Sequence, residues 1–420
     1  MPVRDRLKGV NWIDIESISQ EDSKSAEAET AAARNDDVPS DAGALIIYTR
    51  YQYPLRNVSI STELTIWHSG TTGKPKGVLT THKNLQAQVQ SLAEAWKFTA
   101  DDKILNVLPL HHVHGLINAL TLPLWSGASV EFITFDAKKV WNRWIDKRDL
   151  SVFMAVPTIY SKLIQHYETM SSEQKAKARE ACSQFRLMVS GSAALPDTIF
   201  QKWETISGHR LLERYGMTEI GMALGNPYEG PRIPGTVGKP FPGVKASIRD
   251  QNDQEISGDG PISGELFVSG PQVFEKYWNK PEATAKELQN GWFRTGDIVS
   301  RNEDGVYSIL GRASVDIIKT GGYKISALDI ERELLSYPAV ADVAVLGLPS
   351  EEWGEIIAAM VVFGKDHQQS AEIETLRQFL KDRMAPYKVP RKFLVVDELP
   401  RNVMGKVNKK GLVKFFADKA

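Results

Sequence analysis

The sequence predicts an α/β fold in which a large domain of layered α/β sheets with a β-rich part is followed by a small α+β domain. Three observations predict it. Between residues 84 and 203, short apolar runs alternate with amphipathic helical stretches, which is typical of a largely parallel sheet. From 235 to 310, glycine and proline are frequent and short strands recur. Beyond Gly311, a further series of strands and helices is typical of a compact module.

The elements can be placed in order. Residues 44–49 have the apolar, β-branched character of a buried strand, and residues 151–156 and 158–167 show the alternation of strand and helix most clearly. Residues 264–268 are a strand of the β-rich part. The last region is expected to contain strands at 317–319, 340–348, 357–363 and 393–396, and helices at 326–337 and 373–384.

These elements divide the chain into three parts. A length of 420 residues suggests two or three domains. Residues 1–43 form a residual N-terminal segment, which ends in a flexible connector rich in Ser, Ala, Glu and Asp. Residues 44–312 form the large domain, with the β-rich subdomain at 235–310, and residues 313–420 form the small domain.

The composition is that of a soluble globular protein, with 42% hydrophobic and 25% charged residues and a net charge of -1. Nothing in this balance favours nucleic acid as a partner. We see neither a signal peptide nor an apolar run of the roughly 20 residues that cross a bilayer. We therefore expect an intracellular protein, cytoplasmic or mitochondrial, without stable membrane insertion. Its oligomeric state is left open, a monomer included. The single cysteine, Cys182, excludes an intramolecular disulfide and is expected to be a packing residue.

The glycine-rich run Ser-Gly-Thr-Thr-Gly-Lys-Pro-Lys-Gly, residues 69–77, is the most informative segment. Its glycines let the backbone approach an anion closely, and successive N–H groups with lysine can hold phosphate oxygens. It is not the generic P-loop, because only two residues separate its first two glycines and Pro75 follows Lys74. Taken alone, the run could also be a surface turn.

Further motifs follow this run in a fixed order: 109–115 (PLHHVHG), 190–194 (SGSAA), 214–219 (RYGMTE), 295–297 (TGD), 311–312 (GR) and 400–406 (PRNVMGK). Together they resemble the adenylate-forming family, and within it the acyl-CoA synthetases. The resemblance runs from 69 to 406, most of the chain. It implies the family's fold, a large AMP-binding domain and a small mobile C-terminal domain, and an acid–thiol ligase that uses ATP, Mg²⁺ and coenzyme A.

The resemblance also implies which residues contact the nucleotide and the metal. The contacts with ATP would come from Ser69, Thr71, Thr72, Gly73, Lys76, Ser190, Gly191, Ser192, Tyr215, Gly216, Asp297 and Arg312. In the family, Tyr215 stacks on adenine, Asp297 holds the ribose hydroxyls and Arg312 contacts ribose and phosphate. Mg²⁺ would be bound by Glu219 and Thr71. Taken in isolation, Asp297 could cap a turn, and Arg312 could form a surface ion pair.

The catalytic roles that the resemblance implies belong to Lys406, Thr218 and Glu219. A substrate carboxylate attacks the α-phosphorus of ATP and pyrophosphate leaves; the thiol of coenzyme A then attacks the acyl-AMP. Lys406 would stabilise the charge that develops in the first step, and Gly321 and Gly322 would line the pantetheine tunnel in the second. Read without the family, Lys406 is one more solvated lysine of a basic tail.

The substrate acid is indicated by two stretches, 189–244 and 314–326, which closely resemble malonyl-CoA synthetases. A dicarboxylate needs a cation for its non-reacting end, and Arg232, with His112 at the mouth of the pocket, is the candidate. Methylmalonate is close enough to share the site. Medium-chain or aromatic acids are the alternative substrates, and zinc is a competing but disfavoured interpretation of the clustered histidines.

Two departures from the family raise another hypothesis, a non-catalytic nucleotide-binding remnant. Most of the family's N-terminal stretch is missing, so we expect exposed sheet edges and apolar surface. In addition, residues 50–68 intervene between the strand at 44–49 and Ser69. They could be a real loop whose end, 64–68, replaces the displaced end of that strand, a regulatory insertion, or a translated intron. The intron is favoured because its removal restores the family's pattern.

Overall fold

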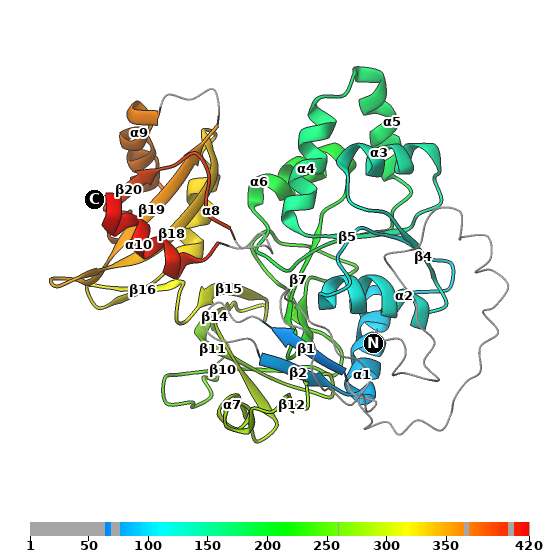
Figure 1. Ribbon diagram of the computed structural model, residues 1–420, viewed down its shortest axis with the longest axis horizontal. Helices are drawn as coiled ribbons and strands as arrows, with labels where there is room; N and C mark the ends of the chain where they lie inside the picture. The colour runs from blue at the N-terminus through cyan, green and yellow to red at the C-terminus, as the bar shows by residue number, and fades with distance from the viewer. Residues whose placement is uncertain (1–63, 69–75, 259, 365–368, 402–406, 420) are drawn as a thin grey trace, which may run out of the picture. The chain divides into compact units, whose positions relative to one another are not determined.

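The structure is a computed structural model, and it describes residues 64–68, 76–258, 260–364, 369–401 and 407–419 (Figure 1). The chain divides into units 1–40 and 41–420, and every described residue belongs to the second. The strand predicted at 44–49 and the glycine-rich run up to Pro75 lie outside the described residues.

A seven-stranded sheet forms the first layer, in the order β4-β3-β5-β6-β7-β8-β9. The strands are β3 (Lys103–Asn106), β4 (Ser129–Phe132), β5 (Val152–Ala155), β6 (Leu187–Ser190), β7 (Leu212–Met217), β8 (Gly221–Gly225) and β9 (Lys239–Pro240). Neighbours from β4 to β7 pair in parallel, and β8 and β9 are antiparallel. The largely parallel sheet predicted from the alternating pattern is therefore present, and the strand predicted at 151–156 is β5.

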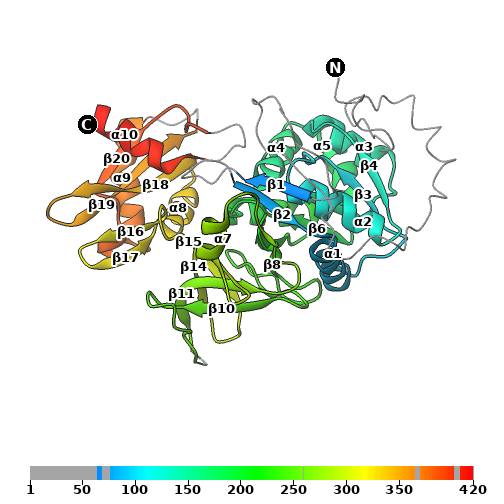
Figure 2. The same ribbon diagram turned by 60° about the horizontal axis from the view of Figure 1, so that its bottom comes forward.

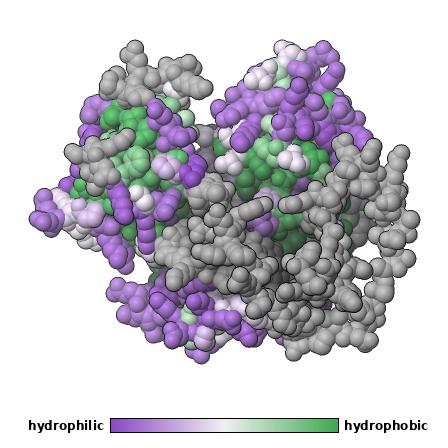
Figure 3. Space-filling view, viewed as in Figure 1, coloured by the Kyte–Doolittle hydropathy of each residue, from purple (hydrophilic) through white to green (hydrophobic). Residues whose placement is uncertain are grey.

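Helices connect and cover these strands: α1 (His82–Trp96), the π-helix η4 (His114–Thr121), α2 (Leu122–Trp125), α3 (Ala137–Asp146), α4 (Pro157–Glu168), α5 (Ser172–Cys182) and α6 (Asp197–Ser207). Three fully buried tryptophans, Trp141, Trp144 and Trp203, pack edge-on or tilted against one another between α3 and α6. The outer surface over α3, α4 and α5 is mainly hydrophilic (Figure 3), as expected of amphipathic helices.

A three-stranded antiparallel sheet, β1 (Leu64–His68), β2 (Lys76–Thr80) and β12 (Lys276–Tyr277), adjoins the first. Leu64 pairs with Thr80 and His68 with Lys76, so all five residues of β1 have a partner on β2. This is the arrangement expected if 64–68 replaces the displaced end of the strand at 44–49. The pairing supports that explanation of the insertion, and the retained intron stays a prediction that a cDNA sequence can check.

The β-rich subdomain is a five-stranded antiparallel sheet, seen with its strands side by side in Figure 2. Its elements are β10 (Lys245–Arg249), β11 (Ile262–Ser269), β13 (Leu288–Gln289), β14 (Trp292–Arg301), β15 (Tyr307–Arg312) and the short helix α7 (Pro281–Glu287). The strand predicted at 264–268 is the centre of β11. The frequent glycines and prolines of this stretch supply its turns.

The C-terminal region folds around a sheet of its own, in the order β17-β16-β19-β18, with β20 paired in parallel to β19. Its elements are β16 (Ile317–Thr320), β17 (Tyr323–Ser326), α8 (Ala327–Leu335), β18 (Val340–Ser350), β19 (Gly354–Phe363), α9 (Gln369–Lys381), the 3₁₀ turn η5 (Pro386–Lys388), β20 (Lys392–Val395) and α10 (Lys409–Lys419). The sequence patterns did not predict β17 or α10, and α9 begins and ends earlier than predicted.

The hydrophobic core follows the same division. One cluster of buried side chains runs from Val78 to Tyr307, and two further clusters lie between Ile318 and Phe416. Cys182 belongs to the first, and burial raises the pKa of its thiol to about 12. That suits the packing role predicted for it, because only a thiolate is a good nucleophile.

Some apolar surface is exposed at one edge of the first sheet. Leu124 and Trp125 at the end of α2 are more than half exposed, and Phe132 at the end of the edge strand β4 is 46% exposed. β4 is the edge strand of this sheet among the described residues, and the expectation of exposed sheet edges stays a prediction. No helix among the described residues is long and apolar enough to span a bilayer.

Candidate active site

The predicted nucleotide residues gather where strands β6 and β7 end. Ligands in open α/β sheets bind outside the carboxyl ends of the parallel strands. Ser190 is the last residue of β6, and Tyr215 and Gly216 lie in the final half of β7. Thr218 and Glu219 occupy the turn that leads from β7 to β8. Two parallel strands thus bring together motifs that are about 25 residues apart in sequence.

The loop after β6 is closely fitted to its surroundings. Ser190 is fully buried, and its hydroxyl has no hydrogen-bond partner among the described residues. A Cβ on Gly191 would lie 2.4 Å from the guanidinium carbon of Arg214, so the Arg214 side chain would have to shift to admit any other residue there. Ser192 is exposed, has φ +70°, and its hydroxyl lies 3.2 Å from Nδ1 of His114. A non-glycine residue in this backbone region is often found at a functional site.

Arg214 lies against the loop after β6, and the motifs assigned it no role. Its side chain lies against Gly191, it is 4% exposed, and its Nε and Nη2 have no partner among the described residues. Burial lowers the pKa of Arg214 to about 9, while the neighbouring Glu213 partly opposes the shift. A buried cation without hydrogen bonds is costly unless an anion joins it. The position therefore favours a negatively charged ligand.

The π-helix η4 adds two buried polar side chains. His114 is almost fully buried, and burial first, then Arg214 and His112, hold its pKa well below the usual value. It is therefore neutral, and its Nε2 has no partner in the described part of the chain. Asn118, on the next turn, is fully buried with both polar atoms unpaired in the same part. π-Helices occur frequently at functional sites.

The predicted ribose clamp forms a connected group. Asp297 on β14 pairs with Arg312 on β15 through Nε and Oδ1, 2.8 Å apart, and accepts a hydrogen bond from the Tyr215 hydroxyl. Arg312 also donates to the Thr295 carbonyl at 3.1 Å. Burial raises the pKa of Asp297, which the Arg312 charge opposes. Three motifs from different strands thus meet at the Asp297 carboxylate. The contact of the Tyr215 hydroxyl with Asp297 was not predicted, and it leaves the ring of Tyr215 as the part that is predicted to stack on adenine.

The metal prediction can be tested on Glu219. One carboxylate oxygen, Oε2, is buried and has no partner among the described residues, while Oε1 accepts from the Tyr277 hydroxyl at 3.1 Å. Mg²⁺ is usually bound by one or two carboxylates together with substrate phosphates and water. Glu219 fits that pattern. No cluster of three or more His, Cys, Asp or Glu side chains that could hold a metal occurs in the described ranges.

Lys76, predicted to contact the triphosphate, begins strand β2. Its Nζ lies 2.7 Å from Oε1 of Glu287 and 4.4 Å from the centre of the Tyr277 ring. Both members of this ion pair are partly exposed, so the lysine can exchange its partner for a phosphate. The other predicted residues of the glycine-rich run and the catalytic lysine lie outside the described residues: Ser69, Thr71, Thr72, Gly73 and Lys406.

Gly321 and Gly322 form the two-residue turn of the β16–β17 hairpin, with φ of +54° and +82°. Two successive positive φ values favour glycine in a hairpin turn. The turn alone therefore accounts for both glycines. A Cβ on Gly322 would meet nothing within 4 Å, so this side of the turn has room for a thin ligand, as the predicted pantetheine contact requires.

The predicted acid-binding residues lie in two places. His112 lies two residues before η4 begins at His114, and its ring lies against that of His111. Arg232 donates three hydrogen bonds to backbone carbonyls, those of Pro227, Tyr228 and Arg210. These bonds hold the loop after β8 in place. These bonds leave Arg232 two of its five N–H donors for a substrate carboxylate, whereas Nε and Nη2 of Arg214, unpaired among the described residues, carry three.

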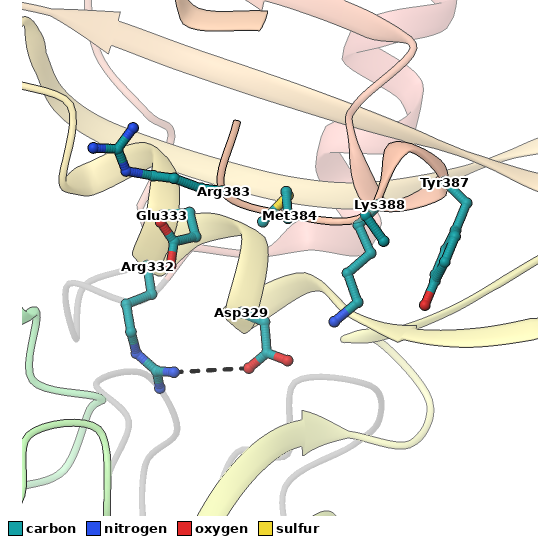
Figure 4. Close-up of a pocket in the computed structure, with 8 residues that line it drawn as sticks. Asp329, Arg332, Glu333, Arg383, Met384, Tyr387 and Lys388 are labelled. Atoms are coloured by element: carbon teal, nitrogen blue, oxygen red, sulfur yellow. Dashed lines mark ion pairs between the residues drawn. The ribbon is translucent and has the colours of Figure 1, made fainter. Parts of the chain in front are cut away.

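A cavity of about 440 Å³ lies elsewhere, in the C-terminal region between α8 and residues 383–388. Figure 4 shows Arg332 and Asp329 of α8 pointing toward one another, with Lys388 and Tyr387 on the opposite side. The lining mixes acidic and basic side chains and contains none of the predicted site residues. It is therefore not the candidate active site.

Models of known families match most of the chain. The AMP-binding enzyme family matches residues 2–278, and the AMP-binding enzyme C-terminal domain matches residues 329–406. The chain belongs to the AMP-binding enzyme family. It has the adenylate-forming fold, with a large N-terminal and a small C-terminal domain. The resemblance drawn from the motifs is thereby confirmed, and the boundary predicted after Arg312 falls between the two matches.

Several relatives of similar sequence are named malonate–CoA ligases. The chain is 47% identical to the mitochondrial malonate–CoA ligase of Bos taurus over 89% of its own length, 48% to that of Homo sapiens over 84%, and 47% to the malonate–CoA ligase of Arabidopsis thaliana over 84%. It spans only 64%, 65% and 60% of the lengths of these relatives.

A solved structure is also similar to this chain. The ATP-bound MatB of Rhodopseudomonas palustris superposes with a TM-score of 0.77 and 36% sequence identity. The superposition covers 85% of this chain and 68% of that one. The closeness to malonyl-CoA synthetases expected from the stretches at 189–244 and 314–326 is confirmed at the level of sequence relatives.

Three functional candidates were missed by the sequence motifs: Arg214, Asn118 and Glu287. Arg214 stands inside a quoted motif, and a charged residue in an otherwise apolar strand is a usable signal. Asn118 within the apolar run of 113–124 is a weaker one. Nothing in the sequence singles out Glu287, because a glutamate on a polar helix is ordinary.

Proposed function

We propose that this protein is an ATP-dependent malonate–CoA ligase that activates malonate as malonyl-AMP and transfers it to coenzyme A. The observation that carries the proposal is the buried guanidinium of Arg214, whose Nε and Nη2 are unpaired among the described residues, beside the loop predicted to hold the α-phosphate. Such a cation needs an anionic partner, and the non-reacting carboxylate of a dicarboxylate can supply one. The relatives named malonate–CoA ligases support the same choice.

The residues of the site divide the work of the first step. Asp297 and Arg312 would hold the ribose, and Ser190 and Thr218 the α-phosphate, so that the attacking carboxylate and the phosphorus stay aligned. Lys406 would stabilise the charge that grows on the phosphate. Magnesium, when bound at Glu219, would neutralise charge on the departing pyrophosphate. In the second step, Gly321 and Gly322 would admit the pantetheine chain.

Arg214 and Arg232 are rival candidates for the cation that binds the second carboxylate. The three carbonyl partners of Arg232 favour a structural role, and the packing of Arg214 on Gly191 favours the substrate role. His112 and the neutral His114 would then lie at the acyl side. Methylmalonate differs by a single methyl group, which is worth only about 1–3 kcal/mol of discrimination.

The test is pyrophosphate release by the purified chain with ATP, Mg²⁺ and either malonate, methylmalonate, acetate, octanoate or benzoate, with and without coenzyme A. We expect malonate-dependent release that rises with coenzyme A. Arg214→Met should lower kcat/KM for malonate by about 10² or more, because loss of one partner of a buried charge pair typically costs about 2–5 kcal/mol. Arg214→Lys should retain part of the activity, and Arg232→Met should retain most of it.

Other outcomes would replace the proposal. If octanoate or benzoate outperforms malonate, the chain is a medium-chain or aromatic acyl-CoA synthetase. If Arg232→Met loses malonate use while Arg214→Met keeps it, the original assignment to Arg232 is correct. If no acid supports release although ATP binds, the chain is a nucleotide-binding remnant.

We also propose that the protein functions in the mitochondrion or the cytoplasm, without nucleic acid as a partner. The support is the mitochondrial designation of the mammalian relative and the near-neutral charge. Fractionation of cells that express a C-terminally tagged chain would separate the two compartments. Sedimentation of the purified protein would establish its oligomeric state.

A further inference from the structure

The ion pair between Lys76 and Glu287 connects to a second hydrogen-bonded group. Glu287, the last residue of α7, holds Lys76 through Oε1 at 2.7 Å and accepts from the Tyr277 hydroxyl through Oε2 at 2.6 Å. The same hydroxyl lies 3.1 Å from Oε1 of Glu219. Two side chains, Glu287 and Tyr277, thus link Lys76 of the glycine-rich run to the carboxylate that fits magnesium.

Backbone pairing fixes this arrangement. Tyr277 of β12 pairs with Val78 of β2, so its side chain lies beside Lys76. The Tyr277 N–H donates to Thr284 of α7 at 3.0 Å, which holds β12 against the helix that carries Glu287. Tyr277 is 2% exposed, and its ring packs against Phe274. The hydroxyl is therefore held between the two carboxylates and cannot turn away.

A tyrosine hydroxyl has one proton, so Tyr277 donates to one carboxylate at a time. Which carboxylate receives it depends on their relative strengths as acceptors. While Lys76 is paired with Glu287, the lysine charge weakens Glu287 as an acceptor, and Glu219 can compete for the proton. When Lys76 moves to a phosphate, Glu287 loses its cation and becomes the stronger acceptor.

We propose that Glu287 and Tyr277 couple the triphosphate contact of Lys76 to the metal contact of Glu219. The proposal rests on the proposed function only in taking ATP as the ligand. Triphosphate binding draws Lys76 away from Glu287. The Tyr277 hydroxyl then donates its hydrogen bond to Glu287, and both carboxylate oxygens of Glu219 become available to a cation. Without nucleotide, Lys76 stays paired with Glu287, and an incoming phosphate has to displace that carboxylate. Glu287 and Tyr277 are positioning residues, since they act through Lys76 and Glu219.

The Glu287→Gln variant separates the two contacts because it should move them in opposite directions. Without its negative charge, residue 287 no longer competes for Lys76, so metal-free ATP should bind roughly two- to fivefold tighter, the scale of a partly exposed ion pair. The neutral amide is also a weaker acceptor, so the Tyr277 hydroxyl keeps donating its hydrogen bond to Glu219. The free Mg²⁺ concentration for half-maximal pyrophosphate release should therefore rise by about the same factor.

Calorimetric titration with ATP in the presence of EDTA measures the first effect, and pyrophosphate release at varied free Mg²⁺ measures the second. Tyr277→Phe should leave metal-free ATP binding unchanged and remove the effect of Glu287→Gln on magnesium. Glu282→Gln, the same charge change at an exposed position of α7, is the matched control and should alter neither. Melting temperatures show whether each variant is folded.

The proposal is overturned if folded Glu287→Gln binds metal-free ATP as wild type and Glu282→Gln do, or if Lys76→Met does not remove the gain. A uniform loss of ATP and magnesium binding in Glu287→Gln would also overturn it, because that result indicates a purely structural role. The calorimetric measurement needs no turnover. A chain that releases no pyrophosphate would therefore fail the proposed function while the coupling could still be tested.

Discussion

At the scale of single residues, the least ordinary groups are two neighbours on β7. Glu213 and Arg214 are consecutive, so their side chains leave opposite faces of the strand. Arg214 faces Gly191, while Glu213 accepts from the Leu195 N–H at 3.0 Å. Burial raises the pKa of Glu213 to about 8. Both groups are kept in the interior at a cost in stability, which suggests that their positions matter more than the stability they forgo.

The raised pKa of Glu213 predicts a pH dependence of stability. The unfolded chain releases this proton near the usual value of 4.5, whereas the folded protein keeps it up to about 8, so stability falls as pH rises between them. Glu213→Gln should abolish this fall. Since one pKa unit corresponds to about 1.4 kcal/mol, the variant should gain on the order of 3–4 kcal/mol relative to wild type between pH 5 and pH 8.

Urea unfolding at pH 5, 6, 7 and 8 measures this difference. The exposed Glu303→Gln variant controls for the change in net charge and should follow wild type at every pH. Parallel stability curves for wild type and Glu213→Gln would show that Glu213 is ionised in the folded protein.

Single residues were also where the sequence was most and least informative. The motif residues Tyr215, Asp297 and Arg312 do meet, because a short motif ties a chemical group to a fixed place on its strand. Glu287 could not be predicted, because its contact with Lys76 joins residues 211 positions apart. Such a pairing depends on how β12 aligns with β2, and no local pattern specifies that alignment.

At the scale of elements, the β16–β17 hairpin combines a structural requirement with a functional expectation. Its two glycines satisfy the turn, and the first also fits against Trp353, which would lie 3.0 Å from an added Cβ. Gly322 faces open space. A substitution at 322 therefore tests the predicted pantetheine contact without disturbing the packing of the hairpin.

Gly322→Ala should cost about 1–2 kcal/mol, because an L-residue is strained at positive φ. We expect KM for coenzyme A to rise, while malonate-dependent pyrophosphate release without coenzyme A stays at the wild-type level. Steady-state kinetics of the two half-reactions provide the measurement. Gly208→Ala, at φ +75° and also in open space, imposes a similar strain in α6's C-cap and should leave KM for coenzyme A unchanged. An equal rise in both variants would assign Gly322 to the turn alone.

Elements with strong periodicity were predicted from the sequence, and the others depend on distant contacts. The helix predicted at 158–167 is α4 with one residue added at each end, since its apolar spacing is regular. The start of α10 is different. Lys409 there is held by Asp316 at 2.6 Å and Glu331 at 2.7 Å. A lysine in a basic tail gives no sign of this buried pairing, and α10 was missed for that reason.

At the scale of the whole molecule, the hydrophobic core is divided close to the predicted domain boundary. Buried side chains up to Tyr307 and from Ile318 onward form separate clusters. A domain with its own core can in principle fold alone. The boundary predicted after Arg312 falls in the gap between these clusters, where a change of sequence texture was also visible.

Residues 313–420 expressed alone should therefore fold. We expect a cooperative thermal transition by circular dichroism and a dispersed amide spectrum by nuclear magnetic resonance. In the full chain, two transitions should appear, one of which matches the isolated fragment. As a control, a fragment that begins at residue 327 lacks β16 and β17 and should not fold. A non-cooperative 313–420 fragment would place the boundary elsewhere.

The uneven distribution of tryptophan has an optical consequence. Of the ten tryptophans, only Trp353 follows residue 312, and the Arg391 guanidinium carbon lies 3.9 Å from the centre of its ring. Emission from the full chain should be dominated by the nine tryptophans that precede residue 312, several of them fully buried. Emission from the C-terminal domain alone comes from one indole, next to Gly321. That fluorophore would report the arrival of a thiol ligand at the hairpin without any label.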